Sequence, residues 1–237
     1  MKISIDVNLI KRNKLITQIS LYAAIGLIII GLFLTFFSQD QSNNKVIISY
    51  LVLLPAYALM QINIFMANKW GHDPRVDQII TNSLKGLDNH YSLFHYTTPV
   101  SHLLVGPAGI WIIKSYHQHG IITYDEKKNK YTQEKGGNFL SRFFAMDNLS
   151  DIEGESKRQT SNLKKYFEKI GIKDYPDPLI ANVFYRPEAK IRAKNAPEIT
   201  ISIDKLKDMI RLHAKKSPLN DEKINKILEK LPEAIRY

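Results

Sequence analysis

The sequence SHLLVGPAGIWIIKSYHQHGIITY, residues 101–124, decides the fold that we expect for this chain. It contains two apolar runs, 103–105 and 110–113, separated by the turn sequence GPAG at 106–109, and a third apolar run follows Gly120. Short apolar runs bounded by Gly and Pro are typical of consecutive β-strands, and strands this apolar are usually covered on both faces. The stretch therefore predicts a three-stranded β-meander at the centre of a folded unit.

The segments on either side of this stretch predict the layers that cover it. Apolar residues recur at helical spacing in some segments and in short continuous runs in others. We expect helices over 73–87 and 154–170, strands over 91–97, 179–185 and 198–203, and two more helices within 204–237. This order predicts an α/β sandwich with a mixed sheet over 71–203. Residues 204–237 are expected to form a helical extension packed on that domain.

Residues 15–37 and 46–66 contain no charged side chain. Each run is long enough to cross a hydrocarbon core of about 30 Å as a helix, and a buried soluble helix is rarely apolar on every face. A cleaved signal peptide is disfavoured because no small-residue cleavage pattern follows the first run. We therefore predict a transmembrane helical hairpin, in which the polar residues Gln18, Gln61 and Asn63 favour pairing between the two helices.

Basic residues lie at the open end of this predicted hairpin. They are Lys11, Arg12 and Lys14 in the N-terminal segment 1–14, and Lys69 and Arg75 after the second run. Because positively charged flanks stay on the cytoplasmic side, the sequence predicts a cell-membrane protein with two spans. Both termini and the whole α/β domain are expected in the cytoplasm, and the lipid bilayer is its first predicted partner.

The 237 residues carry a formal net charge of +10 and no cysteine. The absence of cysteine excludes disulfides and thiolate metal sites. Part of the positive charge lies on the predicted helix over 154–170 and just after it. That helix presents Lys157, Arg158, Lys164, Lys165 and Lys169. It is read as a nucleic-acid face, as a face for anionic lipid headgroups, or as a solvated surface, which is the commonest role of such a helix.

Known catalytic and metal-binding motifs give little support for other activities. The chain contains no P-loop, dinucleotide-binding, serine-hydrolase or zincin pattern. His117 and His119 would share a face on a strand, but a third ligand at a recognisable spacing is missing, which favours ordinary surface histidines. No metal site is predicted from these residues.

The stretch 101–120 resembles the nuclease-related domain family, NERD, a branch of the restriction-endonuclease-like PD-(D/E)xK fold. That family typically reads DHxxxGPxGxxxIExKxxxG across these strands. The matching residues are His102, Gly106, Pro107, Gly109, Ile113 and Gly120, together with the apolar residues between them. The resemblance extends from residue 73 to about residue 185, and it implies the fold rather than a particular activity.

The resemblance also implies where a catalytic site would lie. The family's chemistry needs carboxylates that bind Mg²⁺ and a lysine near the attacking water. Here Ser101 stands in place of the metal-binding Asp, Lys114 in place of the Glu, and Tyr116 in place of the Lys. Asp77, at the position of the family's helix acid, is the one carboxylate retained. A lysine in a carboxylate's place repels a metal ion, so the residues argue against the family's activity.

Three hypotheses about function follow from the sequence. The first is a membrane-anchored, catalytically inactive NERD-like domain, not an enzyme, which works as a binding or scaffolding module for an unidentified protein or ligand and needs no cofactor. The second is an active membrane-bound nuclease that uses Mg²⁺ with Asp77 and displaced acids. The third is a membrane-surface module whose basic helix binds anionic lipid headgroups or DNA.

Overall fold

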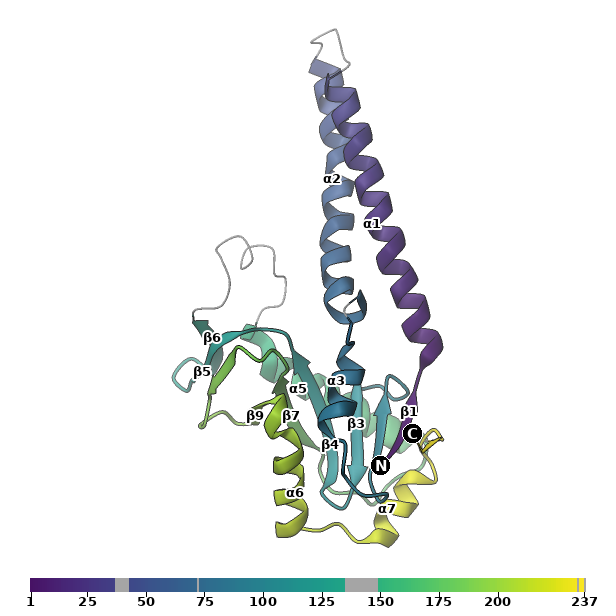
Figure 1. The fold of residues 1–237 in the computed structure, drawn as a ribbon, viewed down its shortest axis with the longest axis vertical. Coiled ribbons are helices and arrows are strands. Elements are labelled where there is room, and N and C mark those ends of the chain that lie inside the picture. The colour runs from purple at the N-terminus through teal and green to yellow at the C-terminus, as the bar shows by residue number, and fades with distance from the viewer. Residues whose placement is uncertain (37–42, 72, 135–148, 234, 237) are drawn as a thin grey trace. The chain divides into compact units, whose positions relative to one another are not determined.

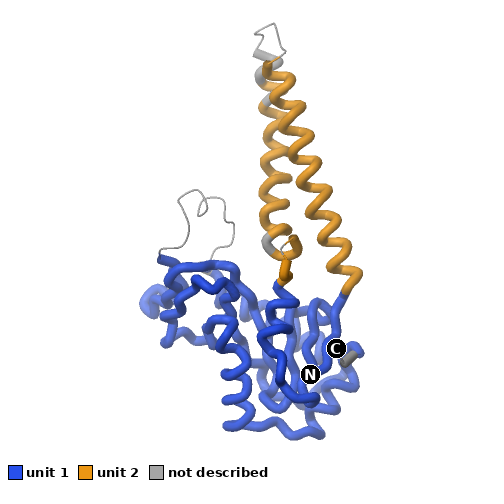
Figure 2. Tube along the Cα trace, in the orientation of Figure 1, with its two compact units in different colours: residues 1–6, 76–139, 148–237 blue, residues 7–75, 140–147 orange. Residues whose placement is uncertain are grey.

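The computed structural model describes residues 1–36, 43–71, 73–134, 149–233 and 235–236. The chain divides into two compact units, which Figure 2 colours separately. One unit contains residues 1–6, 76–139 and 148–237, and we call it the α/β unit. The other contains residues 7–75 and 140–147, and we call it the helical unit.

A mixed sheet of six strands, extended by a two-residue strand at one edge, forms the centre of the α/β unit (Figure 1). Its order is β10-β1-β2-β3-β4-β7-β9. Strands β2, β3 and β4 are antiparallel neighbours, whereas β1 pairs with β2, β4 with β7, and β7 with β9 in parallel. The strands are β1 (Lys2–Ile5), β2 (Ser92–His95), β3 (His102–Gly106), β4 (Gly109–Tyr116), β7 (Leu179–Phe184), β9 (Ile199–Ser202) and β10 (Ile235–Arg236).

The predicted turn at residues 106–109 joins β3 to β4, and both of its glycines have a physical role. A Cβ atom at Gly106 would collide with the ring of Tyr91. Gly109 has φ of 94°, a conformation that side chains other than Gly rarely adopt. The carbonyl of Pro107 accepts a hydrogen bond from the backbone N–H of Leu219 at 2.8 Å, so the turn also holds the segment that leads into the last helix.

Helices cover both faces of the main sheet, as the apolar strands predict. Helices α3 (Val76–Ser83) and α6 (Leu206–Lys216) pack on one face, against a buried cluster that includes Trp111 and Ile113. Helices α5 (Ile152–Lys169) and α7 (Asp221–Leu228) pack on the other, against a cluster that includes Ile110 and Ile112. Alternate residues of β4 therefore point to opposite helical layers. The mixed α/β class is confirmed, and α6 and α7 belong to the same unit as the sheet.

The third strand of the predicted meander does not join the main sheet. It forms β5 (Gly120–Asp125), which lies in a separate three-stranded sheet between β6 (Lys130–Glu134) and β8 (Ala189–Arg192). In the main sheet β7 takes the place beside β4. Gly120 has φ of 85°, which redirects the chain, and Ile122 of β5 is buried with Phe184 in a cluster of its own.

Both ends of the chain contain a strand that the sequence prediction missed. Residues 1–14 were predicted as a basic tail, but Lys2–Ile5 form β1 and a helix begins at Val7. The two-residue β10 pairs with β1 within the predicted helical extension. Of the predicted loop 134–153, residues 135–148 lie outside the described residues, and α5 begins at Ile152.

The helical unit contains α1 (Val7–Phe36), α2 (Asn43–Met66) and a short π-helix, η1 (Ala67–Gly71). Helix α1 is long and apolar enough to cross a membrane, and only 17% of its most apolar segment is buried. A signal sequence shares these properties. The longest apolar segment of α2 among the described residues is shorter, Tyr50–Met66. The structure thus supports one long apolar N-terminal helix, and the second span predicted over 46–66 is not shown.

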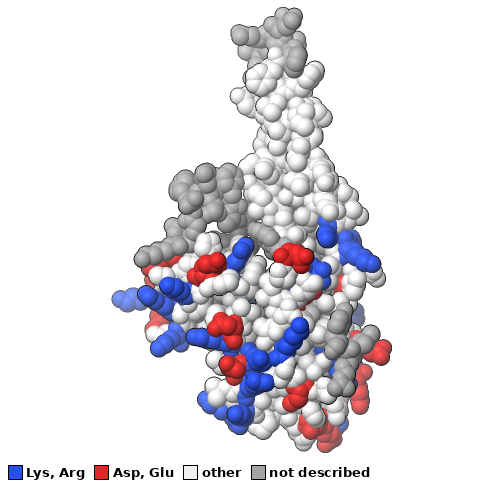
Figure 3. Space-filling model, viewed as in Figure 1, with Lys and Arg blue, Asp and Glu red and all other residues white. Residues whose placement is uncertain are grey.

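Asn63 joins α2 to α1, as the polar residues of the two apolar runs predict. Its side-chain N–H donates to the carbonyl of Thr17 at 2.6 Å and to the hydroxyl of Ser20 at 3.3 Å. In the view of Figure 3 most of the helical unit is uncharged, while basic and acidic side chains are interspersed over the α/β unit.

Candidate functional site

Lys114 is the central residue of a buried polar cluster between β4 and α5. Its position follows from strand alternation, because it lies on the same face of β4 as Ile110 and Ile112. The residue is 3% exposed. Its ammonium donates to the carbonyl of Ile152 and to the hydroxyl of Ser156, both at 2.8 Å. A carboxylate oxygen of Glu155 lies 3.3 Å away, so three oxygens match the three N–H bonds of the ammonium.

Burial lowers the pKa of Lys114 because it removes water from the charged form, and the carboxylates of Glu155 and then Glu198 oppose that shift. Glu155 is 42% exposed, so its own charge stays solvated while it compensates the ammonium. We infer that Lys114 is held as a cation, since the three oxygen atoms around its ammonium can all accept its hydrogen bonds.

Tyr116 belongs to the same cluster. Its hydroxyl donates to the carboxylate of Glu155 at 3.1 Å, and its ring stacks on Phe184 with centroids 5.2 Å apart. The Lys114 ammonium lies 5.5 Å from the centroid of the Tyr116 ring, which adds a cation–π contact. Burial and the nearby carboxylate of Glu155 raise the pKa of the Tyr116 phenol. Tyr116 is therefore a neutral hydrogen-bond donor in this cluster.

A row of hydrogen-bonded polar groups leads from Lys114 toward the edge of the sheet. Ser156 donates to one carboxylate oxygen of Glu198, Oε2, at 2.7 Å, and the side-chain N–H of Asn182 donates to the same oxygen at 2.7 Å. Asn182 is fully buried and is the register partner of Lys114 on the neighbouring strand. Its Oδ1 is buried with no hydrogen-bond partner among the described residues. Tyr131 ends the row, 2.8 Å from the hydroxyl of Thr200.

The four residues that the family resemblance places in a catalytic site divide between the two faces of the sheet. Lys114 and Tyr116 meet at Glu155 on the α5 face. Ser101 is half-buried and lies just before β3. If the pairing of β3 with β4 is continued by two residues, Ser101 is opposite Lys114. Asp77 is fully buried on α3, which packs on the opposite face. The structure therefore brings Lys114 and Tyr116 together and places Asp77 in another layer.

A separate polar cluster, which the sequence prediction missed, lies on the α3 face. The Nδ1 atoms of His95 and His102 are 2.7 Å apart, and both side chains are buried. The Nε2 atom of His95 lies 2.9 Å from the hydroxyl of Thr81. His102 is one of the residues that carry the family resemblance, and its role here is to join β3 to β2.

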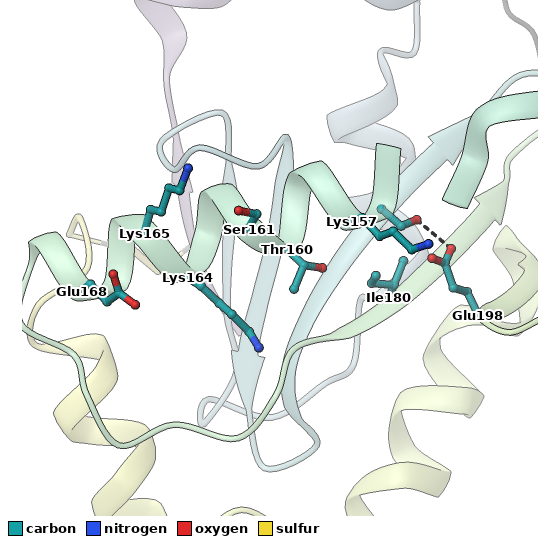
Figure 4. A pocket seen from close by; sticks show the side chains of 9 residues that line it. Lys157, Thr160, Ser161, Lys164, Lys165, Glu168, Ile180 and Glu198 are labelled. Atoms are coloured by element: carbon teal, nitrogen blue, oxygen red, sulfur yellow. Dashed lines mark hydrogen bonds between the residues drawn. The ribbon is translucent and has the colours of Figure 1, made fainter. Parts of the chain in front are cut away.

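A cavity of about 530 Å³ lies beside α5, over the strands at the sheet edge. We call it the α5 groove. Figure 4 shows the side chains that surround it. They come from one stripe of α5, from Ile180 of β7 and from the residue before β9: Ser156, Lys157, Thr160, Ser161, Lys164, Lys165, Glu168, Ile180 and Glu198. Ser156 and Glu198 thus belong both to the groove and to the Lys114 cluster.

The structure separates the five basic residues predicted on this helix. Lys157, Lys164 and Lys165 line the α5 groove, and Lys164 is also paired with Asp177 at 2.7 Å. Arg158 is paired with Asp151 at 3.0 Å and lies outside the groove lining, as does Lys169. The five cations therefore do not form one continuous basic face.

Within the described residues, no three His, Cys, Asp or Glu side chains converge as metal ligands. His117 and His119 follow β4 and precede β5, so they do not share a strand face as a metal-binding pair would. The acids that reach the cluster, Glu155 and Glu198, have no signal in the sequence, because only the packing of α5 and of the segment before β9 brings them to β4.

Comparisons with protein-family models, with curated proteins and with solved structures find no match to this chain. The resemblance to the NERD family therefore rests on the residues quoted above.

Proposed function

We propose that this chain is a membrane-anchored, catalytically inactive relative of the NERD nucleases, whose α/β unit works as a binding module. The observation that carries the proposal is the position of Lys114. Its ammonium lies where the resemblance implies a metal-binding carboxylate, and it is surrounded by Glu155, Ser156 and Ile152. The Lys114 ammonium supplies at this position the positive charge that a metal ion would supply in the nuclease.

This arrangement disfavours metal-dependent chemistry on electrostatic grounds. A divalent ion near Lys114 would meet a fixed positive charge, and this repulsion costs about 2 kcal/mol at 4 Å in water and several times more in a protein interior. The carboxylate of Glu155 is already used by the ammonium and by Tyr116. Asp77, the acid that a nuclease of this type would retain, packs with α3 on the other face of the sheet. The nuclease hypothesis is therefore our second choice.

The order of elements supports the relationship to the nuclease fold. Helix α3, the antiparallel strands β2 to β4, helix α5 and the parallel strand β7 follow one another as the resemblance requires. The Gly-rich turn joins the two strands that would carry the catalytic positions.

We also propose two membrane spans, α1 and α2, and the pairing of β1 supports them. Lys2–Ile5 pair in parallel with β2, in the same sheet as the strands that follow the helical unit. Residues 1–6 and 76–237 must then lie in one compartment, so the chain between them crosses a bilayer an even number of times. If α1 spans, α2 returns; a single span or a cleaved signal sequence would separate β1 from its sheet. The contact of Asn63 with α1 supports pairing of the two helices.

The cytoplasmic side is proposed from the basic flanks. Lys11, Arg12 and Lys14 lie in the first turns of α1, and Lys69 and Arg75 follow α2, which matches the positive-inside tendency. A reporter that is active only in the cytoplasm, fused after Tyr237, should give a signal, and so should the same reporter before Met1. A signal at one terminus only would contradict the two-span proposal.

The absence of nuclease activity is tested on the full chain purified in detergent. We expect no cleavage of single- or double-stranded DNA with Mg²⁺ or Mn²⁺. Metal-dependent cleavage would overturn the proposal if it were lost in Asp77→Asn or Glu198→Gln and kept in Lys169→Ala, which removes a charge outside the cluster. Activity that persists unchanged in all variants would identify a copurified nuclease.

A further inference from the structure

The α5 groove offers a binding site that adjoins the Lys114 cluster and shares Ser156 and Glu198 with it. We propose that it binds a small molecule that carries a phosphate monoester on a hydroxyl-bearing body, such as a phosphorylated polyol. The inference rests on the proposed function in one respect, namely that the α/β unit binds a ligand.

The size of the groove limits its occupant. Its volume of about 530 Å³ falls within the range of about 300–1,000 Å³ that is usual for small-molecule sites. An inorganic anion alone would leave most of this space unfilled. A nucleic-acid duplex would need a continuous basic surface along the backbone, and Arg158 and Lys169 do not contribute to the groove.

The ammonium of Lys157 makes one end of the groove suitable for an anion, whereas Lys165 lies farther along α5 (Figure 4). Lys157 and Lys165 make no ion pair or hydrogen bond with any other described residue, whereas Lys164 is paired with Asp177. In Figure 4 the ammonium of Lys157 points toward the end of the groove that Glu198 and Ile180 form. An ammonium held beside a partly enclosed space attracts an anionic group more strongly than one in open water.

The hydroxyl of Thr160 gives the second observation that points to a ligand. Its oxygen is buried and has no hydrogen-bond partner among the described residues, although it lies in the groove lining. A buried hydroxyl without a partner is costly, and rotation of the Thr160 side chain about its Cα–Cβ bond would turn this hydroxyl toward a ligand oxygen beside Lys157. A phosphate monoester has three acceptor oxygens and a charge close to −2, which suits an ammonium and a hydroxyl together.

Glu198 supplies the reason to expect hydroxyl groups on the same ligand. One of its oxygens, Oε2, accepts hydrogen bonds from Ser156 and Asn182. No described residue donates to the other oxygen, Oε1. Oε1 can accept a hydrogen bond from a ligand, so the ligand should present a hydroxyl a few ångströms from its phosphate. Ile180 between them contacts the carbon body.

The test uses the full chain in nanodiscs of neutral phosphatidylcholine, with inositol 1-phosphate as the probe in calorimetry. We expect saturable binding that weakens about tenfold or more in Lys157→Ala and about tenfold in Thr160→Val, as loss of a bond to a charged group predicts. Lys169→Ala is the matched control, with the same charge change on the same helix, and should bind within about twofold of the wild type. Melting temperatures check that each variant is folded.

Further probes define the ligand class and its source. Inorganic phosphate and unphosphorylated inositol should each bind at least tenfold more weakly than the combined probe. Nanodiscs that contain phosphatidylinositol 4-phosphate would compete with the soluble probe if the natural source is a lipid headgroup, and would have no effect if it is a soluble phosphate.

Several outcomes would overturn the inference. They are no saturable binding, equal binding of inositol and its phosphate, equal loss of binding in Lys169→Ala, and equal binding of glucuronate, which carries a carboxylate instead of a phosphate. None of these results bears on DNA cleavage. Metal-dependent cleavage, in turn, would refute the proposed function without changing the binding result.

Discussion

The two faces of the central sheet bury polar side chains in different ways. On the α5 face, the Lys114 ammonium is charged and is surrounded by acceptors, one of them the half-exposed carboxylate of Glu155. On the α3 face, His95 and His102 share a hydrogen bond of 2.7 Å. Because one Nδ1 must donate and the other accept, at least one of these imidazoles is neutral.

This difference shows what each kind of group needs in order to be buried. A charge requires a compensating charge and several hydrogen bonds, since its desolvation is expensive. Here the carboxylate of Glu155 compensates the Lys114 ammonium and is itself partly exposed to solvent. Ser156, which accepts from Lys114, is hydrogen-bonded to Glu198, and both residues line the α5 groove. The hydrogen bond between the two imidazoles can form with no net charge on either ring. The face that carries the Lys114 ammonium is also the one that carries an accessible cavity.

The strongest test of this comparison reverses the charge at the centre of the α5 face. Lys114→Glu would add a third carboxylate to those of Glu155 and Glu198, and we expect a loss of about 4 kcal/mol or more in unfolding free energy. If the ammonium does replace a metal ion, Mn²⁺ should raise the melting temperature of this variant and leave that of the wild type unchanged. Thermal unfolding of the full chain in detergent measures both effects.

Lys114→Met is the control for that variant, because it keeps the aliphatic stem and removes the charge. It should lose less stability than Lys114→Glu and show no response to Mn²⁺. Equal stabilisation of the wild type by Mn²⁺ would mean that the metal binds elsewhere, and the ammonium would then not occupy a metal position.

A smaller effect is expected on the α3 face. His102→Ala removes a buried ring and the hydrogen bond that it shares with His95, at a cost of about 3 kcal/mol. Thr81→Val keeps the side-chain volume and removes only the hydroxyl that contacts His95, at a cost of about 1 kcal/mol. Urea unfolding of the two variants measures this order, and neither should respond to Mn²⁺. If Thr81→Val costs as much as His102→Ala, the cluster depends on Thr81 more than on the imidazole pair.

The local parts of the fold were predictable from the sequence. The turn at 106–109 marks β3 and β4 because Gly and Pro interrupt two apolar runs. Because residues 103–105 and 110–113 are all apolar, both faces of these strands need a covering layer. Helix α5 was predicted from its periodicity, to within two residues at its first turn. These are features that residues close in sequence determine among themselves.

The parts that failed depend on which segments meet in space. The run after Gly120 is apolar like its neighbours, but the strand that pairs with β4 is β7, which lies far along the chain. Strand β1 has four residues, too few to show the alternation of apolar and polar residues that is typical of a strand, and it forms by pairing with β2. In the candidate site, Lys114 and Tyr116 were located by the resemblance, whereas Glu155, Ser156 and Glu198 become neighbours only after α5 packs on the sheet.

The smallest expected effect concerns Tyr116 at alkaline pH. Burial, and then the carboxylate of Glu155, raise the pKa of this phenol above its ordinary value of 10.0. The folded state therefore keeps a proton that the unfolded chain releases above pH 10, so this share of stability is complete below pH 10 and is lost as the pH rises further. Tyr116→Phe lacks the phenol and its bond to Glu155, and should be about 1 kcal/mol less stable at pH 8. Urea unfolding from pH 8 to pH 11 should show the wild type losing stability faster above pH 10 and approaching the variant. Curves that stay parallel would mean that the phenol ionises as easily in the folded protein as in the unfolded chain, and the α5 face would then not be sealed around Tyr116.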